Sequence, residues 1–437
     1  MNKPINSIFY SQCGGAMHIQ SLLKKINVLS CIISIFAVLF ILIVISACLF
    51  GFSELTDSWA NQAKLVAPDG VEYSYFGKSI AITNDYAFVA SSSVLESDYD
   101  GGIYIYKRDN NTWHYNAKLT DLEGSNAYGH PFCVAVHEDT LVIGYRVSYN
   151  IEHFHDGALF VCNLVKDKWT YSQKIHFPDN NSDWPFYEVD IYKNKIIAGT
   201  GGASNRAYIF SNDKGVWSLE GTLVPSDIMP GDEFGLSVGI SGKYAIVGAP
   251  FSGNKKGAVY VFKRKGNTWK HISKLQPINK SNNAYTLFGL NSAISDNCII
   301  ASANYKLNRV VIVYNIVGNK VKQKAVLSAP KYDKRKIYFA GSVAIEGKTL
   351  IVGSGRKYWY VSKSTAYIYI LDNDKWTLQS TIQDNDIYDG RDGDSFGCNV
   401  AIADDYIIVG DVYDSQYGED QGAAYIFARQ VETGISY

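Results

Sequence analysis

A run of five aspartates is the densest group of side chains in this chain that could do chemistry. It lies in the segment DNDIYDGRDGDSFG, residues 384–397. The carboxylates of Asp384, Asp386 and Asp389 are oxygen ligands of the type that calcium binds. Their spacing differs from that of an EF-hand loop. These aspartates are therefore the metal-site candidates of the chain, with a solvated loop as the simpler interpretation, and the sequence indicates no cofactor.

Motifs of known enzyme active sites are missing from the sequence. It contains no GxSxG, HExxH or P-loop motif, and no CxxC pair of the kind that holds zinc. His153 and His155 form an HxH pair beside Asp156, but two imidazoles and one carboxylate in one segment are better explained as part of a surface loop. The remaining acidic residues are dispersed. We therefore expect a protein that is not an enzyme, with a carbohydrate-active enzyme as the alternative.

Aromatic residues in long polar segments are the better functional signal. The chain has 32 Tyr and 8 Trp, and many lie among Asn and Asp between apolar stretches. Such amphipathic rings stack on sugars or on protein side chains and also make directional hydrogen bonds. The candidate ligand-binding residues are Tyr75, Trp184, Tyr358, Trp359, Tyr413 and Tyr417.

The strands that must position these segments form a repeat. A strand that ends in an apolar residue, and starts with Trp in six of its seven copies, recurs between residues 59 and 382 as WANQAKL, WHYNAKL, WTYSQKI, WSLEGTL, WKHISKL, VKQKAVL and WTLQSTI. Three further strand families recur between these copies, typified by SVGI, YAIVGA and AVYVF in residues 237–262. Four strands per unit and seven units, with a period of about 53 residues, predict an all-β, seven-bladed β-propeller of four-stranded blades.

The two ends of the repeat indicate how the ring closes. The first Trp strand, residues 59–65, has no inner strands before it, and the last third strand, residues 423–428, has no Trp strand after it. We expect these two strands to pair, which completes the seventh blade and hides two sheet edges. The propeller then occupies residues 59–430, with a short linker at 53–58 and a tail at 431–437.

The order of the motifs FG, SVAI, IVGAP and GAVYVF resembles the FG-GAP repeat. The fullest copy combines Phe234-Gly235 with Gly248-Ala249-Pro250 and Gly257-Ala258. The dipeptide is kept at Phe76-Gly77, Phe288-Gly289 and Phe396-Gly397, nearly kept at Phe339-Ala340, and lost at His130-Pro131 and Pro185-Phe186. The resemblance implies the propeller fold of integrin α heads and of many bacterial surface proteins, and it covers almost all of the chain after residue 58.

Calcium binding is not implied by this resemblance. Integrin α chains carry DxDxDG loops between the first and second strands of several blades. The corresponding links here are tight three-residue turns, such as TND at 83–85 and SGK at 241–243, which offer too few oxygen ligands. The chain is closer to the calcium-free bacterial form of the repeat, for which the motif implies no chemistry.

The amino-terminal segment predicts one hydrophobic helix. Residues 26–52 contain no charged side chain, and 27 residues exceed the length needed to cross a bilayer. Lys24 and Lys25 precede the segment, so residues 1–25 should lie in the cytoplasm and the propeller outside. Three fates stay open: a lipoprotein signal in which Cys48 of ISAC is lipidated, an uncleaved membrane anchor, or a cleaved signal peptide.

Net charge excludes one large class of partner. The chain has 41 basic and 42 acidic side chains, a net charge of −1, and both signs are scattered, which argues against nucleic acid. We therefore expect an exported, membrane-associated recognition or adhesion module that binds an extracellular protein or glycan through its long loops. A purely structural surface scaffold is a further alternative.

Overall fold

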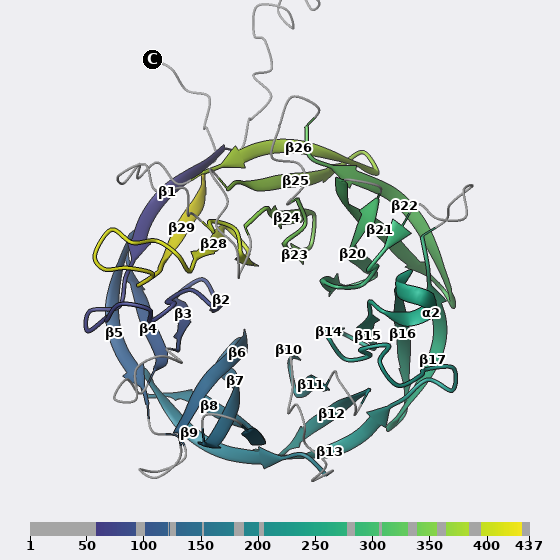
Figure 1. The fold of residues 1–437 in the computed structure, drawn as a ribbon, viewed down its shortest axis with the longest axis horizontal. Coiled ribbons are helices and arrows are strands. Elements are labelled where there is room, and N and C mark those ends of the chain that lie inside the picture. The colour runs from purple at the N-terminus through teal and green to yellow at the C-terminus, as the bar shows by residue number, and fades with distance from the viewer. Residues whose placement is uncertain are drawn as a thin grey trace, which may run out of the picture. The chain divides into compact units, whose positions relative to one another are not determined.

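The computed structural model confirms an all-β, seven-bladed propeller of four-stranded blades (Figure 1). The structure describes residues 58–92, 101–120, 122, 128–150, 153–178, 188–200, 205–277, 285–305, 308–330, 339–355, 364–383 and 395–430. Within these ranges, Ser58–Gln430 forms one compact unit.

Each blade is an antiparallel sheet whose first strand lies nearest the central axis and whose fourth lies outside (Figure 1). The strands of blades 1 to 3 are β2 (Ser79–Ile82), β3 (Tyr86–Ser91), β4 (Gly102–Asp109) and β5 (Thr112–Leu119); β6 (Tyr128–His137), β7 (Thr140–Asn150), β8 (His153–Val165) and β9 (Lys168–His176); and β10 (Glu188–Tyr192), β11 (Lys195–Thr200), β12 (Arg206–Asp213) and β13 (Val216–Leu223).

Blades 4 to 6 follow the same order. Their strands are β14 (Ser237–Ser241), β15 (Tyr244–Ala249), β16 (Ala258–Lys265) and β17 (Thr268–Leu275); β19 (Ser292–Ser295), β20 (Cys298–Tyr305), β21 (Asn308–Val317) and β22 (Lys320–Ser328); and β23 (Ser342–Glu346), β24 (Thr349–Gly353), β25 (Ala366–Asp372) and β26 (Lys375–Ile382). Two short elements were not expected from the sequence: the helix α2 (Ser252–Lys255), and β18 (Tyr285–Thr286), which pairs with β20.

Blade 7 closes the ring as predicted. It consists of β27 (Asn399–Ala403), β28 (Tyr406–Asp411), β29 (Ala423–Gln430) and β1 (Ser58–Leu65). The pairing of β1 with β29 runs from Ser58 opposite Gln430 to Leu65 opposite Ala424. The outer strand of the last blade therefore comes from the start of the propeller sequence.

Apolar cores lie between neighbouring blades, because each inner strand buries both of its faces. Phe88 and Ala90 of β3 pack toward blade 2, whereas Ala87 and Val89 of the same strand pack toward blade 7. This alternation follows from the two-residue period of a strand. It explains why the second and third strands read as continuous apolar runs without a polar face.

The tryptophan of each outer strand packs against the preceding blade. Trp169 of blade 2 lies edge-on to Phe88 of blade 1 at 4.8 Å between ring centroids. Trp113 of blade 1 meets Tyr406 of blade 7 in the same way at 5.6 Å. The repeated Trp is therefore a contact between blades, while blade 5, which has Val321 at this place, lacks it.

A β-bulge interrupts every outer strand at the same place. In all seven blades the register against the third strand skips the residue three positions after the Trp position. Bulges of this kind twist an edge strand and interrupt its row of unpaired backbone N–H and C=O groups, which hinders pairing with a strand of another chain. The skipped residues are Gln62, Asn116, Ser172, Glu220, Ile272, Lys324 and Gln379.

The Phe-Gly dipeptides join consecutive blades. Phe76 and Phe234 are fully buried and lie edge-on to Tyr104 and Tyr260, at 5.3 and 5.4 Å between ring centroids. Gly235 has a φ of +103°, and a Cβ built there would lie 2.5 Å from the carbonyl oxygen of Arg206. Glycine is needed there for its backbone conformation and for the close approach of the neighbouring chain.

The predicted hydrophobic helix at 26–52 lies outside the described residues, as do residues 1–25, 53–57 and 431–437. Within the described part of the chain, no helix is long and apolar enough to span a membrane.

Candidate functional site

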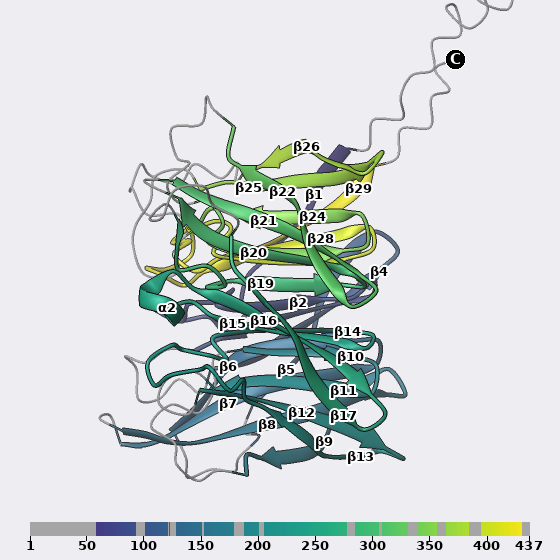
Figure 2. The same cartoon turned by 90° about the vertical axis from the view of Figure 1, so that its right-hand side faces the viewer.

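The two rims of the propeller carry different connections (Figure 2). Turns between first and second strands lie on one rim and contain two residues in six of the blades, for example Glu138-Asp139, rather than the expected three. The loops between second and third strands and the links between blades lie on the opposite rim, together with α2. This long-loop rim is where the sequence predicted ligand-binding residues.

The structure brings two of the predicted residues into contact. Tyr75 lies in the link between β1 and β2, and Tyr413 lies in the loop between β28 and β29. Their rings meet edge to face, 6.1 Å apart at the centroids. Tyr417 belongs to the same loop as Tyr413. The other predicted residues, Trp184, Tyr358, Trp359, Cys48, Asp384, Asp386 and Asp389, lie outside the described residues.

Backbone hydrogen bonds fasten the β1–β2 link to the β28–β29 loop. The side-chain hydroxyl of Ser74 adds a further bond to the carbonyl of Gln421, at 3.0 Å. Because the two segments form a short ladder, each fixes the conformation of the other. The backbone N–H groups of Tyr73, Tyr75 and Phe76 donate to the carbonyls of Glu419, Asp420 and Gln421 at 2.7, 3.2 and 2.9 Å, respectively.

A buried aspartate shapes the start of the β28–β29 loop. Oδ1 of Asp411 accepts hydrogen bonds from the backbone N–H and the hydroxyl of Ser395, both at 2.9 Å, and from the N–H of Tyr413 at 3.3 Å. Ser395 Oγ in turn accepts the N–H of Val412 at 2.9 Å. This network turns the chain as it leaves β28 and fixes the backbone that carries Tyr413.

Lys64 supports the base of the loop, a role that the sequence did not reveal. Its ammonium lies 2.9 Å from Oδ2 of Asp414, and the hydroxyl of Tyr425 donates to the same oxygen at 2.8 Å. The ammonium also lies over the rings of Tyr425 and Tyr417, 5.3 and 5.8 Å from their centroids. Lys64 thus makes a cation–π contact with the otherwise exposed Tyr417.

The same lysine–aspartate–tyrosine arrangement recurs in blade 1. Lys118 pairs with Asp69 at 2.9 Å and lies over the ring of Tyr104, whose hydroxyl donates to Asp69 at 2.6 Å. Burial alone would raise the pKa of Asp69, but the hydrogen bonds from Tyr104 and Lys118 outweigh it and hold the pKa below its usual value. This arrangement is a structural brace of the rim.

Blade 4 contains a third copy. Lys274 pairs with Asp227 at 2.7 Å and lies over the ring of Tyr260, 5.0 Å from its centroid. Blade 7 adds a second ring to this arrangement, because Lys64 also lies over the exposed Tyr417.

Aromatic rings and carboxylates share the surface above blades 7 and 1. We call it the tyrosine–acid surface and define it by Glu72, Tyr73, Tyr75, Tyr413, Tyr417 and Glu419. Tyr417 is 64% exposed, and both glutamates are exposed. A hydrogen bond with Glu419 raises the pKa of Tyr73 to about 12. The surface offers rings and hydrogen-bonding groups together.

No metal centre is found in the described part of the chain. There, no group of three or more His, Cys, Asp or Glu side chains is arranged to hold an ion.

Three segments of the chain match the family model of the FG-GAP repeat: residues 59–106, 217–262 and 376–427. Each match begins in the outer strand of one blade and ends in the third strand of the next, as in β1 to β4. The matched units thus contain the inner strands of blades 1, 4 and 7, in each of which the described residues form the lysine–aspartate–tyrosine brace. No curated protein sequence matches the chain.

Solved structures that resemble this chain are distant from it in sequence. U3-55K is 9% identical over 84% of this chain and 98% of its own, with a TM-score of 0.50, so this likeness concerns the fold alone. A protein from Lactobacillus plantarum and a putative 6-phosphogluconolactonase from Bacteroides fragilis are 13% and 14% identical, with TM-scores of 0.46 and 0.45, and each match covers 70% of this chain and 84% of the other. The repeat matches and the closed ring of four-stranded blades together show a seven-bladed β-propeller that carries FG-GAP repeats in three of its segments.

Proposed function

We propose that the chain is an exported recognition module that binds a protein or a glycan through its long-loop rim. The observation that carries the proposal is the tyrosine–acid surface. Tyr75 comes from the start of the propeller sequence, and Tyr413 and Tyr417 come from its end, yet they share one side of the rim. Closure of the ring by β1 and β29 is what unites them.

The chemistry of this surface suits recognition. Tyrosine presents a large, rigid ring and a hydroxyl, and it is enriched among the residues that dominate binding energy. Tyr417 keeps 64% of its area exposed even though the Lys64 ammonium lies over its ring, so most of the side chain is available to a partner. The adjacent Glu419 supplies a hydrogen-bond acceptor for a sugar hydroxyl or for a polar side chain.

The rigidity of the two segments also supports binding. Loops that order only on binding lose affinity to that ordering. Here the ladder between residues 73–76 and 419–421, together with the Asp411 network, holds the loops before a partner arrives. A partner would therefore meet a surface that is already formed.

Export is part of the proposal and rests on the amino-terminal sequence. The uncharged segment 26–52 follows two lysines and contains the Cys48 lipidation candidate. Labelling of cells with palmitate tests this point. Loss of label in Cys48→Ser identifies a lipoprotein, whereas no label in either chain leaves a membrane anchor or a cleaved signal.

A binding screen with the full-length chain tests the proposed function. The chain, kept in a non-ionic detergent, is applied to a glycan array and to an array of extracellular proteins. A ligand found there is then titrated against Tyr417→Ala and Tyr413→Ala. The matched control is Tyr171→Ala, because Tyr171 is a 48% exposed tyrosine on the outer strand β9, away from the rim.

Loss of a central aromatic contact should weaken binding at least about tenfold. We expect this loss for Tyr417→Ala and Tyr413→Ala, with no change for Tyr171→Ala and unchanged melting temperatures. Equal affinity in all three variants, or a ligand that contacts the short-turn rim, would overturn the proposal.

A further inference from the structure

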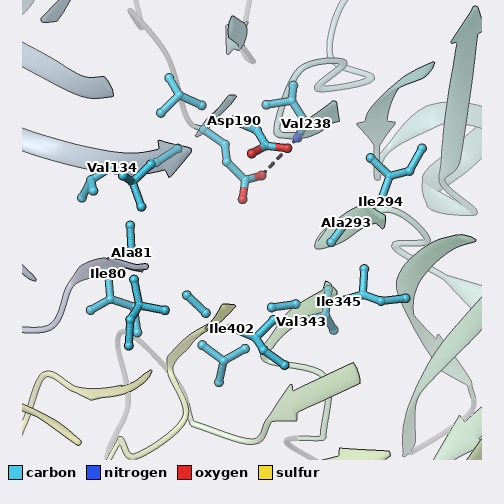
Figure 3. Close-up of a pocket in the computed structure, with 18 of the residues that line it drawn as sticks. Ile80, Ala81, Val134, Asp190, Val238, Ala293, Ile294, Val343, Ile345 and Ile402 are labelled. Carbon is cyan, nitrogen blue, oxygen red and sulfur yellow. Dashed lines mark hydrogen bonds between the residues drawn. The ribbon is translucent and has the colours of Figure 1, made fainter. Parts of the chain in front are cut away.

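The first strands of the blades enclose a cavity on the central axis, lined mainly by apolar side chains such as Ile80 and Ile345 (Figure 3). Asp190 of β10 also lines it, and its two carboxylate oxygens accept the backbone N–H groups of Ile191 and Ile240, both at 2.8 Å. This carboxylate is therefore tied to its own strand and to the next blade. On the short-turn rim, in contrast, some charged side chains lack a partner of opposite charge.

Two lysines lie over one tyrosine ring at the junction between blades 4 and 5. Nζ of Lys243, in the β14–β15 turn, is 5.6 Å from the ring centroid of Tyr244, and Nζ of Lys263, on β16, is 5.8 Å from it. Lys263 also donates to the side-chain oxygen of Asn319, in the β21–β22 turn, at 2.6 Å. The Tyr244 hydroxyl donates to the carbonyl of Gly318 in the same turn, at 3.5 Å. One ring therefore brings two ammonium groups to the same junction.

The junction between blades 1 and 2 has the same design with its charge neutralised. Lys107 lies over the ring of Tyr86, 5.8 Å from its centroid. Asp167 takes the place of Asn319, and its carboxylate accepts hydrogen bonds from the Lys107 ammonium and the Tyr86 hydroxyl. The turn lysine of blade 4 is replaced there by Asp85. The fold therefore does not require an excess of positive charge at this position.

The junction of blades 4 and 5 carries such an excess. In the described part of the chain, neither Lys243 nor Lys263 forms an ion pair. Lys265 and Lys320 are exposed at the ends of β16 and β22 beside the same turns, and Asp296 is the acidic residue of the neighbouring β19–β20 turn. We call the four lysines the lysine cluster. Like charges gathered in this way attract an anionic partner.

The chain enters the propeller on the same rim. Ser58 of β1 pairs with Gln430 of β29. The adjacent Arg429 donates its backbone N–H to the carbonyl of Asp405, in the β27–β28 turn, at 2.8 Å, so Ser58 lies on the short-turn rim. Five residues separate Ser58 from the uncharged segment 26–52, and this link spans at most about 20 Å when fully extended. A membrane that holds the segment would therefore be within reach of this rim.

We propose that the short-turn rim docks on an anionic phospholipid bilayer through the lysine cluster. The headgroup phosphates supply the negative charge that the cluster lacks, and each lysine near such a surface strengthens the attachment about fivefold. The acidic turn Asp404-Asp405 of blade 7 lies on the same rim, so the propeller would tilt toward the bilayer at blades 4 and 5. The long-loop rim then faces outward. This inference rests on the membrane association proposed above, but not on the ligand of the long-loop rim.

Fluorescence quenching by spin-labelled lipid tests the docking. The full-length chain is reconstituted into nanodiscs of phosphatidylcholine alone or of phosphatidylcholine mixed with phosphatidylglycerol, each with the same amount of headgroup spin label. A fluorescent amino acid replaces Asn297, an exposed residue of the β19–β20 turn, or Tyr417 on the opposite rim. The extent of quenching gives the ratio of docked to undocked chain.

Two changes weaken the cluster in different ways, and one serves as a control. The double variant Lys243→Gln, Lys263→Gln removes two charges, whereas Asn319→Asp keeps every lysine and adds the carboxylate that the other junction has. The matched control is Lys107→Gln, because this lysine lies over its tyrosine in the same way but is already paired with Asp167.

We expect the docked-to-undocked ratio at position 297 to be at least about fivefold higher in anionic than in neutral discs, and to fall in high salt. The double variant and Asn319→Asp should each lower it about fivefold or more, Lys107→Gln should not, and position 417 should stay unquenched. Equal ratios in the two lipids, or ratios unchanged in both the double variant and Asn319→Asp, would overturn the docking alone. A chain that stays with neither kind of disc would overturn the membrane association, and the docking with it.

Discussion

The indole N–H of Trp269 in blade 4 donates to the carboxylate of Glu220 in blade 3, at 2.9 Å. Glu220 is the bulged residue of its outer strand, so the bulge directs its side chain toward the next blade. The same carboxylate also pairs with Lys195 at 3.0 Å and with Arg264 at 2.9 Å, and its side chain is only 7% exposed. The bulge that recurs in every outer strand therefore places a carboxylate in a cluster of ion pairs between blades 3 and 4.

Replacement of Glu220 by Gln should destabilise the propeller substantially. The amide keeps an acceptor for Trp269 but leaves the buried ammonium of Lys195 without its counter-charge, which costs about 3 kcal/mol or more. The control is Gln379→Ala, because Gln379 accepts the indole of Trp59 at an equivalent joint without charge and is worth about 1 kcal/mol. Urea unfolding measures both. Equal losses in the two variants would show that the charges add nothing.

Acid should weaken the ion pairs and hydrogen bonds of the Glu220 carboxylate. Burial alone would raise the pKa of Glu220, but hydrogen bonds from Lys195, Trp269 and Arg264 hold it below its usual value. A carboxyl whose pKa is lower in the folded state contributes stability above its unfolded pKa and loses that contribution as pH falls through the folded pKa. The free energy of unfolding of the wild type should therefore drop more steeply than that of Glu220→Gln between about pH 5 and pH 3. Parallel curves would contradict this assignment.

The first, second and third strand families, the Trp strands and the ring closure could all be predicted from the sequence. Their signal is local: apolar alternation within strands, a Trp in six of the seven outer strands, and turns between the strands. The bulges could not, because the skipped residues are as different as Ser172, Ile272 and Lys324 and share only a position.

The candidate site was predictable only in part. Loop length and composition pointed to Tyr75, Tyr413 and Tyr417, but not to the contact between two of them. The supporting pair of Lys64 and Asp414 was missed. In blade 7 the aspartate of this brace lies in the loop between the second and third strands, β28 and β29. In blades 1 and 4 it comes from the preceding link, as with Asp69, so no fixed spacing marks it.

Gly235 of the FG dipeptide in blade 4 should be far less replaceable than a glycine with a positive φ and open space around it. Gly235→Ala puts a Cβ 2.5 Å from the carbonyl oxygen of Arg206 and 2.8 Å from the N of Thr200, and we expect a loss of about 2–4 kcal/mol. Gly231→Ala has a similar φ of +84° but no atom within 4 Å, so its cost should be about 1–2 kcal/mol. Thermal and urea unfolding compare them. A smaller loss at Gly235 would refute the packing argument for the dipeptide.

The charge of Asp190 should make stability decline with rising pH. Its pKa is raised by burial to about 7, so its contribution is full below the unfolded pKa and is lost as pH rises through the folded pKa. Asp190→Asn should therefore gain stability relative to the wild type on going from about pH 5 to about pH 8. Melting curves at the two pH values measure the difference. If the gap between the two proteins does not change with pH, Asp190 does not titrate in this range.

Site-specific photocrosslinking on intact cells tests the proposed recognition surface directly and does not require an identified ligand. A benzophenone amino acid replaces Tyr417 in one strain and Tyr171 in another, since both tyrosines are well exposed but only Tyr417 lies on the long-loop rim. We expect a discrete crosslinked product from position 417, reduced by the additional change Tyr413→Ala, and none from position 171. No product from position 417, or the same product from both positions, would contradict it.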